Sequence, residues 1–239
     1  MIVAIDGPAG SGKSTTAGEV ARRLGYLHVD SGAFYRALTY ALIQEGIPVD
    51  RWDGYTVEEL DALEVRGERR DAHQSDDGAP AADVTIRVAG EVVDEELRSA
   101  DVNACVSRVA RIPAVRDWLL GRLRELAHSE NVVVDGRDIG TVVFPDAGTK
   151  VFLVADPEVR ARRRLAQQGV EEPGLDTLRE EVERLRERDR QDSEREVAPL
   201  RVAEDAVVVD TTALTFEEQV TAILELARGR AAGAGAPVS

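Results

Sequence analysis

The chain has 239 residues, of which 43% are hydrophobic and 31% are charged, so it is long enough and apolar enough to fold around a core of its own. Its formal net charge of −15 argues against a general binder of nucleic acids or anionic membranes, because both would repel it at long range. No apolar run reaches the roughly 20 residues that span a bilayer, and the single cysteine, Cys105, has no intrachain partner, so we expect a cytoplasmic protein that binds neither nucleic acid nor membrane.

Five continuously apolar runs predict the strands of a sheet that is buried on both faces. Stretches with apolar residues at helical spacing separate these runs. Strands that alternate with helices pair in parallel through right-handed crossovers, so we predict an α/β protein with three layers and a five-stranded parallel sheet. The strands are expected at 2–6, 26–29, 131–135, 150–155 and 206–210, and the helices after Lys13 and at 102–127, 157–168, 175–195 and 216–228.

Residues 63–98 interrupt this alternation of strands and helices. Short β-rich runs around a turn at Gly90 predict a small antiparallel insert. The polar stretch 69–83 within it contains turn residues and shows no periodicity, so we expect a mobile loop there. The β-rich runs lie at 63–66, 84–88 and 91–93.

Residues 7–14 read Gly-Pro-Ala-Gly-Ser-Gly-Lys-Ser, which matches the phosphate-loop (P-loop) pattern G-x-x-x-x-G-K-[ST]. A predicted strand precedes this segment and an amphipathic helix follows it, as such a loop requires. Glycines let backbone N–H groups turn toward a phosphate, and the helix N-terminus adds positive potential. A glycine-rich turn without a nucleotide would need neither Lys13 nor Ser14, so we predict that Lys13 holds the β- and γ-phosphates of ATP and that Ser14 ligates Mg²⁺. The predicted ATP-binding residues are Gly7, Pro8, Ala9, Gly10, Ser11, Gly12, Lys13, Ser14 and Thr15.

An acidic residue at the end of a neighbouring strand should complete the magnesium site. Asp135 ends the run VVVD and is the natural candidate. Many aspartates simply end a strand, however, and Asp6 and Asp30 end strands at the same sheet edge, so either could share this role. We predict Ser14 and Asp135 as the metal ligands.

Two classes of P-loop protein compete for this chain. A GTP-dependent switch needs a guanine-reading [NT]-K-x-D motif and a D-x-x-G motif, and the sequence contains neither. A small-molecule kinase instead needs a second anion site that faces the P-loop, usually built from arginine. A second anion site would therefore distinguish a kinase from a switch.

Four segments could supply the second anion site. The helix at 175–195 is the most informative, because its apolar stripe continues at the same spacing into charged residues. Its remaining charges are typical of ordinary pairs on a helix surface. Two further segments follow the carboxyl ends of predicted strands, where open α/β sheets bind their ligands. The stripe reaches Arg188, Asp192 and Arg195, and the other segments are 30–36, 135–141 and the arginine cluster at 160–164.

With these segments the chain resembles the bacterial cytidylate kinases, which are P-loop nucleoside monophosphate kinases. The resemblance covers about residues 1–226 and rests on DSGAFYR at 30–36, DGRDIGTVVFPDA at 135–147 and the run from Glu187 to Leu200. It implies that the γ-phosphoryl group of ATP passes to CMP, and to dCMP as well, with Mg²⁺ as the cofactor.

The same resemblance implies how the chain is divided. One kinase domain would occupy 1–228, with an antiparallel insert in the CMP-binding region and a short lid that closes over ATP. The core would comprise 1–60 and 99–228, the insert about 61–98, the lid about 156–172, and a disordered tail 229–239.

The resemblance also implies a role for individual residues. Asp138 would accept a hydrogen bond from the exocyclic amine of cytosine, which makes chemical sense because uracil carries a carbonyl at that position. Ser107 and Arg116 would meet the same base edge. Arg188 and Asp192 would contact the ribose, Ser31 would lie in the CMP site, and Arg36, Arg137 and Arg195 would hold the acceptor phosphate. The expected catalytic residues are Lys13, Arg137, Arg160 and Arg163.

The acceptor in such a reaction is already an oxyanion, so no general base is needed. We expect catalysis by alignment and charge neutralisation, with lid closure excluding water. Two alternatives stay open, namely a P-loop kinase for another small acceptor, such as a different nucleotide or a polyol, and a non-enzymatic P-loop regulator. The regulator would need neither the charged stripe nor Asp138. Our expectation for the oligomeric state is a monomer.

Overall fold

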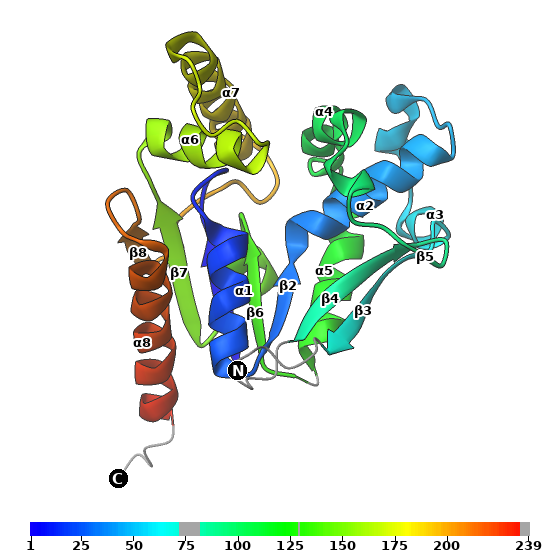
Figure 1. Ribbon diagram of the computed structural model, residues 1–239. Coiled ribbons are helices and arrows are strands. Elements are labelled where there is room, and N and C mark those ends of the chain that lie inside the picture. Colours follow the sequence, from blue (N-terminus) through cyan, green and yellow to red (C-terminus); the bar gives the residue numbers. More distant parts are fainter. Residues whose placement is uncertain (72–81, 129, 235–239) are drawn as a thin grey trace.

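Five parallel strands form the centre of the molecule, as the sequence predicts (Figure 1). The computed structural model describes residues 1–71, 82–128 and 130–234. The central strands lie in the order β2-β6-β1-β7-β8, and each neighbouring pair among them is parallel. Their bounds are Ile2–Asp6 for β1, Leu27–Asp30 for β2, Val132–Gly136 for β6, Thr149–Val154 for β7 and Val207–Asp210 for β8.

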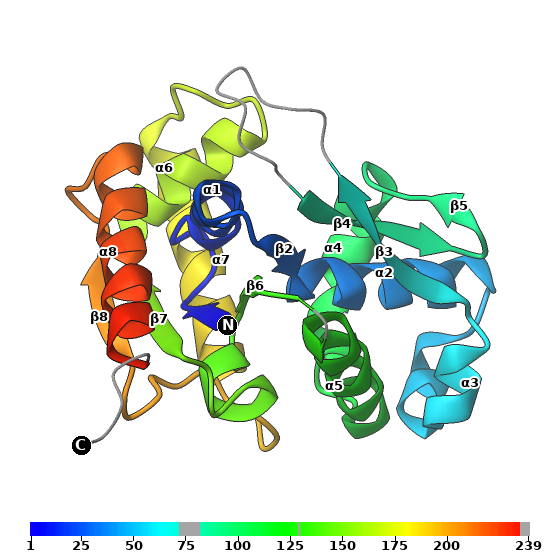
Figure 2. The same ribbon diagram turned by 90° about the horizontal axis from the view of Figure 1, so that it is seen from below.

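Helices cover both faces of this sheet (Figure 2). Helices α1 (Lys13–Leu24) and α8 (Phe216–Ala234) cover one face, and α2 (Ser31–Gln44) and α5 (Pro113–His128) cover the other. Alternate residues of β1 contact the helices on opposite faces of the sheet. Val3 and Ile5 pack with α1 and α8, whereas Ala4 packs on the side of α2 and α5. The strands are therefore apolar on both faces, and the predicted three-layer α/β fold is confirmed.

The antiparallel insert is present, but it extends the main sheet. Strand β4 (Ala82–Val88) pairs antiparallel with β3 (Val65–Asp71) and with β5 (Glu91–Val92). The start of β4 pairs in parallel with β2, so one eight-stranded sheet results. The ends of the stretch 69–83, expected to be a loop, belong to β3 and β4, and residues 72–81 lie outside the described part.

Two helix predictions need correction. The stretch 102–127, expected as one helix, forms α4 (Ala100–Val109) and α5, because Pro113 cannot continue a helix but suits the first position of the next one. Helix α8 continues to Ala234, so 229–234 are helical and not a disordered tail, while 235–239 lie outside the described residues. The remaining helices are α3 (Val57–Asp61), α6 (Pro157–Gln167) and α7 (Leu175–Ser193), with single turns at Val49–Gly54, Glu96–Arg98 and Ile139–Val143.

The carboxyl ends of the parallel strands point toward α6 and α7 on one side and toward α2 and α4 on the other (Figure 1). A small separate core docks the first of these helix pairs on the P-loop, because Ala9 packs with Ala161 and Leu165 of α6 and with Leu185 of α7. This arrangement places the predicted site segments around one edge of the sheet. Among the helices of the described residues, none combines the length and the hydrophobicity that crossing a bilayer requires.

Candidate active site

The P-loop connects β1 to α1 through backbone conformations that require glycine. Gly7 has φ 147°, and a Cβ atom there would lie 2.2 Å from the carbonyl oxygen of Leu153. Gly12, at the N-terminus of α1, has φ 90° and offers no side chain that could cap the helix. The first N–H groups of α1 consequently keep their hydrogen-bonding capacity for an anion.

Lys13 is buried within this loop. Its Nζ donates to the carbonyl oxygen of Pro8 at 2.6 Å and lies 3.5 Å from Ser11 Oγ. Burial lowers the pKa of Lys13 well below its usual value, the positive charges of Arg137 and Arg188 add to this, and Asp135 and Asp6 oppose it. A phosphate beside Lys13 would supply the negative charge that this environment lacks.

Ser14 and Asp135 lie together next to Lys13. Ser14 Oγ donates to Asp135 Oδ2 at 2.5 Å, and His28 Nε2 lies 2.8 Å from Asp135 Oδ1. Burial would raise the pKa of Asp135, but the hydrogen bond and charge of His28, the hydroxyl of Ser14 and the charge of Lys13 together hold it below its usual value. The two oxygen atoms form a pair of hard donors of the type that Mg²⁺ prefers, so the residues present fit the predicted magnesium site.

The other two strand-end aspartates have different partners. Both carboxylate oxygens of Asp6 accept backbone N–H groups, from Ile139 at 2.8 Å and from Gly140 at 2.7 Å. Asp30 caps α2 by accepting the N–H of Ala33 and pairs with Arg36 at 2.7 Å. Asp135 is therefore the strand-end aspartate whose carboxylate faces Ser14.

Asp138 and Arg116 form a buried ion pair between the turn after β6 and helix α5. Arg116 also donates to the hydroxyl of Tyr35 at 3.0 Å. Burial raises the pKa of Asp138, and the charges of Arg116, Arg195 and Arg137 oppose this rise. A cavity of about 70 Å³ adjoins the pair and is lined by Ser31, Tyr35, Arg116, Asp138, Val142 and Val197, among others. The structure thus places a small pocket with one buried carboxylate between α2, α5 and the turn after β6.

Helix α7, the segment that follows it and the turn after β6 bring three arginines to this edge of the sheet. Arg137 Nε donates to Asp192 Oδ2 at 2.9 Å, and Arg195 Nε donates to the carbonyl oxygen of Asp192 at 3.2 Å. Arg188 has no hydrogen-bond or ion-pair partner among the described residues, and its Nε is shielded from solvent. Burial lowers the pKa of Arg188 to about 10, and the positive charge of Arg137 contributes to the same shift.

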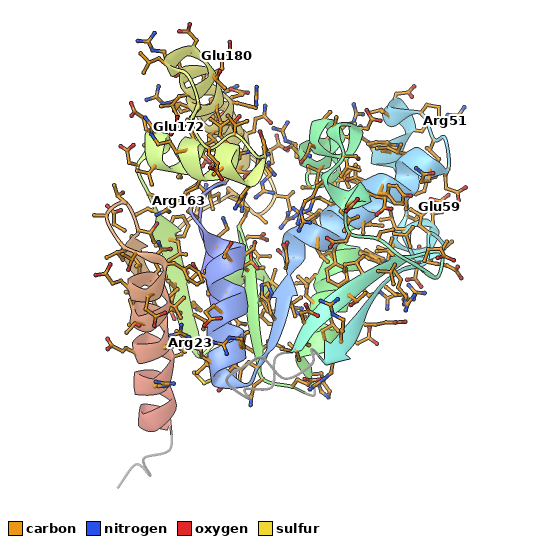
Figure 3. All side chains as sticks on the ribbon, viewed as in Figure 1. Arg23, Arg51, Glu59, Arg163, Glu172 and Glu180 are labelled. Atoms are coloured by element: carbon orange, nitrogen blue, oxygen red, sulfur yellow. The ribbon has the colours of Figure 1, made fainter. Side chains whose placement is uncertain are left out.

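The predicted lid arginines contact the P-loop and its surroundings. Arg160 Nη1 donates to the carbonyl oxygen of Ala9 at 3.2 Å and to Asp189 Oδ2 at 2.6 Å, so it joins the P-loop, α6 and α7. Arg163 donates to the hydroxyl and the carbonyl oxygen of Thr211, and Figure 3 shows it between α6 and the turn after β8. Catalytic roles for these two arginines stay predictions.

The three remaining predicted residues lie on α2 and α4. Ser107 is half-buried on α4, and its side chain makes no hydrogen bond within the described parts of the chain. Arg36 is held by Asp30, within electrostatic reach of Arg188. Ser31 Oγ donates to the carbonyl oxygen of Asp135, which ties the start of α2 to the end of β6.

Sequence reasoning missed several residues that the structure brings to this edge. His28, Tyr35 and Asp189 contact Asp135, Arg116 and Arg160, respectively. The first two lie in or beside the predicted segment 30–36, but nothing in their spacing distinguishes them from ordinary strand and helix residues. Asp189 directly follows Arg188, and only the structure shows that its side chain turns toward α6.

Comparison with known proteins agrees with the family resemblance that the sequence motifs indicate. The family model described as cytidylate kinase matches residues 3–229. The cytidylate kinase of Geobacillus sp. (strain WCH70) is 44% identical over 230 residues, covering 95% of this chain and 96% of that protein. The cytidylate kinase of Pelodictyon phaeoclathratiforme is 42% identical over 236 residues, with 96% of each chain covered. That of Pseudomonas aeruginosa (strain LESB58) is 44% identical over 225 residues, with 93% of each covered. The chain therefore belongs to the cytidylate kinase family.

Proposed function

We propose that this protein transfers the γ-phosphoryl group of ATP to CMP and to dCMP, releasing ADP and the corresponding diphosphate. The observation that carries the proposal is the guanidinium of Arg188, which has no partner among the described residues and stands with Arg137 close enough to the Lys13 ammonium to depress its pKa. Of these three cations, Arg137 is paired with Asp192, whereas Arg188 has no ion pair within the described residues, and the phosphates of two nucleotides would supply further negative charge.

The donor side follows from the P-loop. The backbone N–H groups at the start of α1 would bind the phosphates of ATP, and Lys13 would neutralise charge on the β- and γ-phosphates. Ser14 and Asp135 would hold Mg²⁺, which supplies further neutralisation of the phosphate charge when it is bound. His28 fixes the orientation of Asp135 through its hydrogen bond.

The acceptor side follows from two groups of charged residues. Arg36, Arg137, Arg188 and Arg195 would hold the phosphate and ribose of CMP together with Asp192. Asp138 would accept from the cytosine amine inside the small cavity, while Arg116 maintains its negative charge. Alignment of the two phosphates between these groups needs no general base, because the attacking atom is an oxyanion.

The assignment of substrates is testable with the purified protein. ADP release, coupled to an indicator reaction, would be measured with ATP and a panel of nucleoside monophosphates, with a polyol as an additional acceptor. We expect CMP and dCMP to be preferred over UMP, AMP and GMP. Preference for another acceptor would favour a related kinase, and nucleotide binding without any turnover would favour a regulator. We also propose that the enzyme acts as a cytoplasmic monomer, which its sedimentation velocity would test.

Base selection provides a separate prediction. Replacing Asp138 with asparagine should lower the discrimination between CMP and UMP by roughly 10-fold to 100-fold, because an amide can donate to the uracil carbonyl that a carboxylate repels. The ratio of kcat/KM for CMP to that for UMP measures this effect. The amide of the Asp138→Asn variant keeps an acceptor oxygen for Arg116, so the fold should persist.

Asp146→Asn is the matched control for this variant. Asp146 is exposed in a turn at the opposite end of the sheet, beside Met1 and Gly148. Its replacement should leave the CMP-to-UMP ratio unchanged. An unchanged ratio in Asp138→Asn as well would remove Asp138 from base recognition.

A further inference from the structure

We propose that Asp6 is a positioning residue, which ties the turn that carries Arg137 and Asp138 to the strand that leads into the P-loop. The inference rests on the proposed function, because it assigns Asp6 to the alignment of donor and acceptor. It differs from the expectation that Asp6 shares in metal binding, since both of its carboxylate oxygens face backbone N–H groups.

The contacts of Asp6 are specific and fully enclosed. Oδ1 accepts the N–H of Ile139 at 2.8 Å, Oδ2 accepts that of Gly140 at 2.7 Å, and the residue is only 4% exposed. A buried carboxylate is costly unless hydrogen bonds satisfy it. Conversely, two buried N–H groups would lose their acceptors if Asp6 were absent. The carboxylate and the turn thus depend on each other.

The turn has little room to take another position. A Cβ atom at Gly140 would lie 3.2 Å from Lys150 Cδ and 3.4 Å from Asp6 Oδ2. A Cβ atom at Gly136, just before the turn, would lie 2.6 Å from Ser31 Oγ. Glycine at both positions lets the backbone approach closely, and Asp6 then holds it by hydrogen bonds.

The anchored segment carries two charged groups of the acceptor site. Arg137 donates to Asp192 on α7, and Asp138 pairs with Arg116 on α5. Asp6 directly precedes Gly7, the first residue of the P-loop. One side chain therefore fixes the distance between the donor loop and the acceptor turn, and a displacement of about 1 Å between reacting groups can cost roughly 10²-fold in rate.

The test is Asp6→Asn, which keeps the shape of the side chain but replaces one acceptor oxygen with an NH₂ group that faces an N–H. We expect the KM for CMP to rise by roughly 10-fold to 100-fold. The KM for ATP should change less than the KM for CMP, because the P-loop is shaped by its glycines and by the contact of Lys13 with Pro8, and because Asp135 still supports the charge of Lys13 when the charge of Asp6 is removed. Asp6→Ser, with a single smaller acceptor, should shift the two constants in the same unequal way.

The control is Glu217→Gln. Glu217 also joins separate elements, since its carboxylate on α8 accepts from Arg23 of α1 at 2.5 Å and 2.6 Å, but both helices lie on the face of the sheet opposite α2 and α5. We expect this variant to melt at the same or a slightly lower temperature with an unchanged KM for CMP.

The outcomes separate the inference from the function on which it rests. A wild-type protein that neither binds nor phosphorylates CMP would refute the proposed function. A wild-type KM for CMP in Asp6→Asn would refute only the positioning role. Equal losses of ATP and CMP affinity, or failure of both Asp6 variants to fold, would show that Asp6 supports the whole domain, and the inference would be wrong.

Discussion

Replacing Lys13 with alanine is expected to lower kcat by roughly 10³-fold, which corresponds to about 4 kcal/mol of transition-state stabilisation. Lys13 is the ammonium of the P-loop, and its charge would lie against the phosphoryl group in flight. Burial already lowers the pKa of this lysine, so its charged form is disfavoured in the absence of nucleotide. The fold should therefore lose little stability with the charge, as thermal unfolding without ligand would show.

The second lysine of the chain is a matched control. Lys150 is also buried, and it donates to Asp205 at 2.8 Å and to the carbonyl oxygen of Pro145. These contacts join two loops away from the P-loop, and the aliphatic stem of Lys150 packs beside Gly140, so Lys150→Ala should reduce stability and lower kcat far less than Lys13→Ala does. Turnover at the wild-type rate in Lys13→Ala would show that the P-loop does not act on the transferred phosphoryl group.

The parallel core was predictable because its signals are local. Each strand is a continuous apolar run, and the P-loop is recognised by spacing and by the strand and helix on either side of it. The break before Pro113 follows from proline geometry and was available in the sequence, but a continuous apolar stripe concealed it. Local patterns thus predicted the order of the elements better than their ends.

The pairing of β4 with β2 could not be predicted in the same way. Within the described residues its register covers only Leu27 with Ala82 and His28 with Asp83, and charged residues in β3 and β4 mask the strand pattern. Arg70 and Asp83, which belonged to the expected loop, pair across the two strands at 2.7 Å on an exposed surface. Such a pair stabilises the two strands through polar side chains. The sequence there has no alternation of apolar and polar residues from which a strand could be predicted.

The partners of single side chains in the candidate site could not be predicted from the sequence either. Asp6, Asp30 and Asp135 all end parallel strands, and nothing in the sequence distinguishes their partners in advance. The direction of each carboxylate depends on which loop lies beside it, and that is a property of tertiary packing. Arg160 is a second case, because spacing within the cluster at 160–164 does not reveal that its guanidinium turns inward to Ala9 and Asp189.

Replacing Arg188 with methionine should lower kcat/KM for CMP by roughly 10³-fold and should leave the KM for ATP nearly unchanged. Burial, the charge of Arg137 and the absence of a partner among the described residues make the cation costly in the ligand-free protein. Methionine has a similar length and no charge, so the melting temperature should stay constant or rise. Lower activity combined with equal or greater stability is the result expected of a ligand-binding residue.

Arg190→Met is the control, two residues farther along the same helix. Arg190 is exposed and pairs with Glu187 at 2.8 Å and with Glu194 at 3.1 Å, contacts that are worth less than about 1 kcal/mol on a surface. It should keep wild-type kinetics for both substrates. If Arg188→Met were instead less stable and as active as the wild type, its guanidinium would serve the fold, and the acceptor phosphate would have to bind elsewhere.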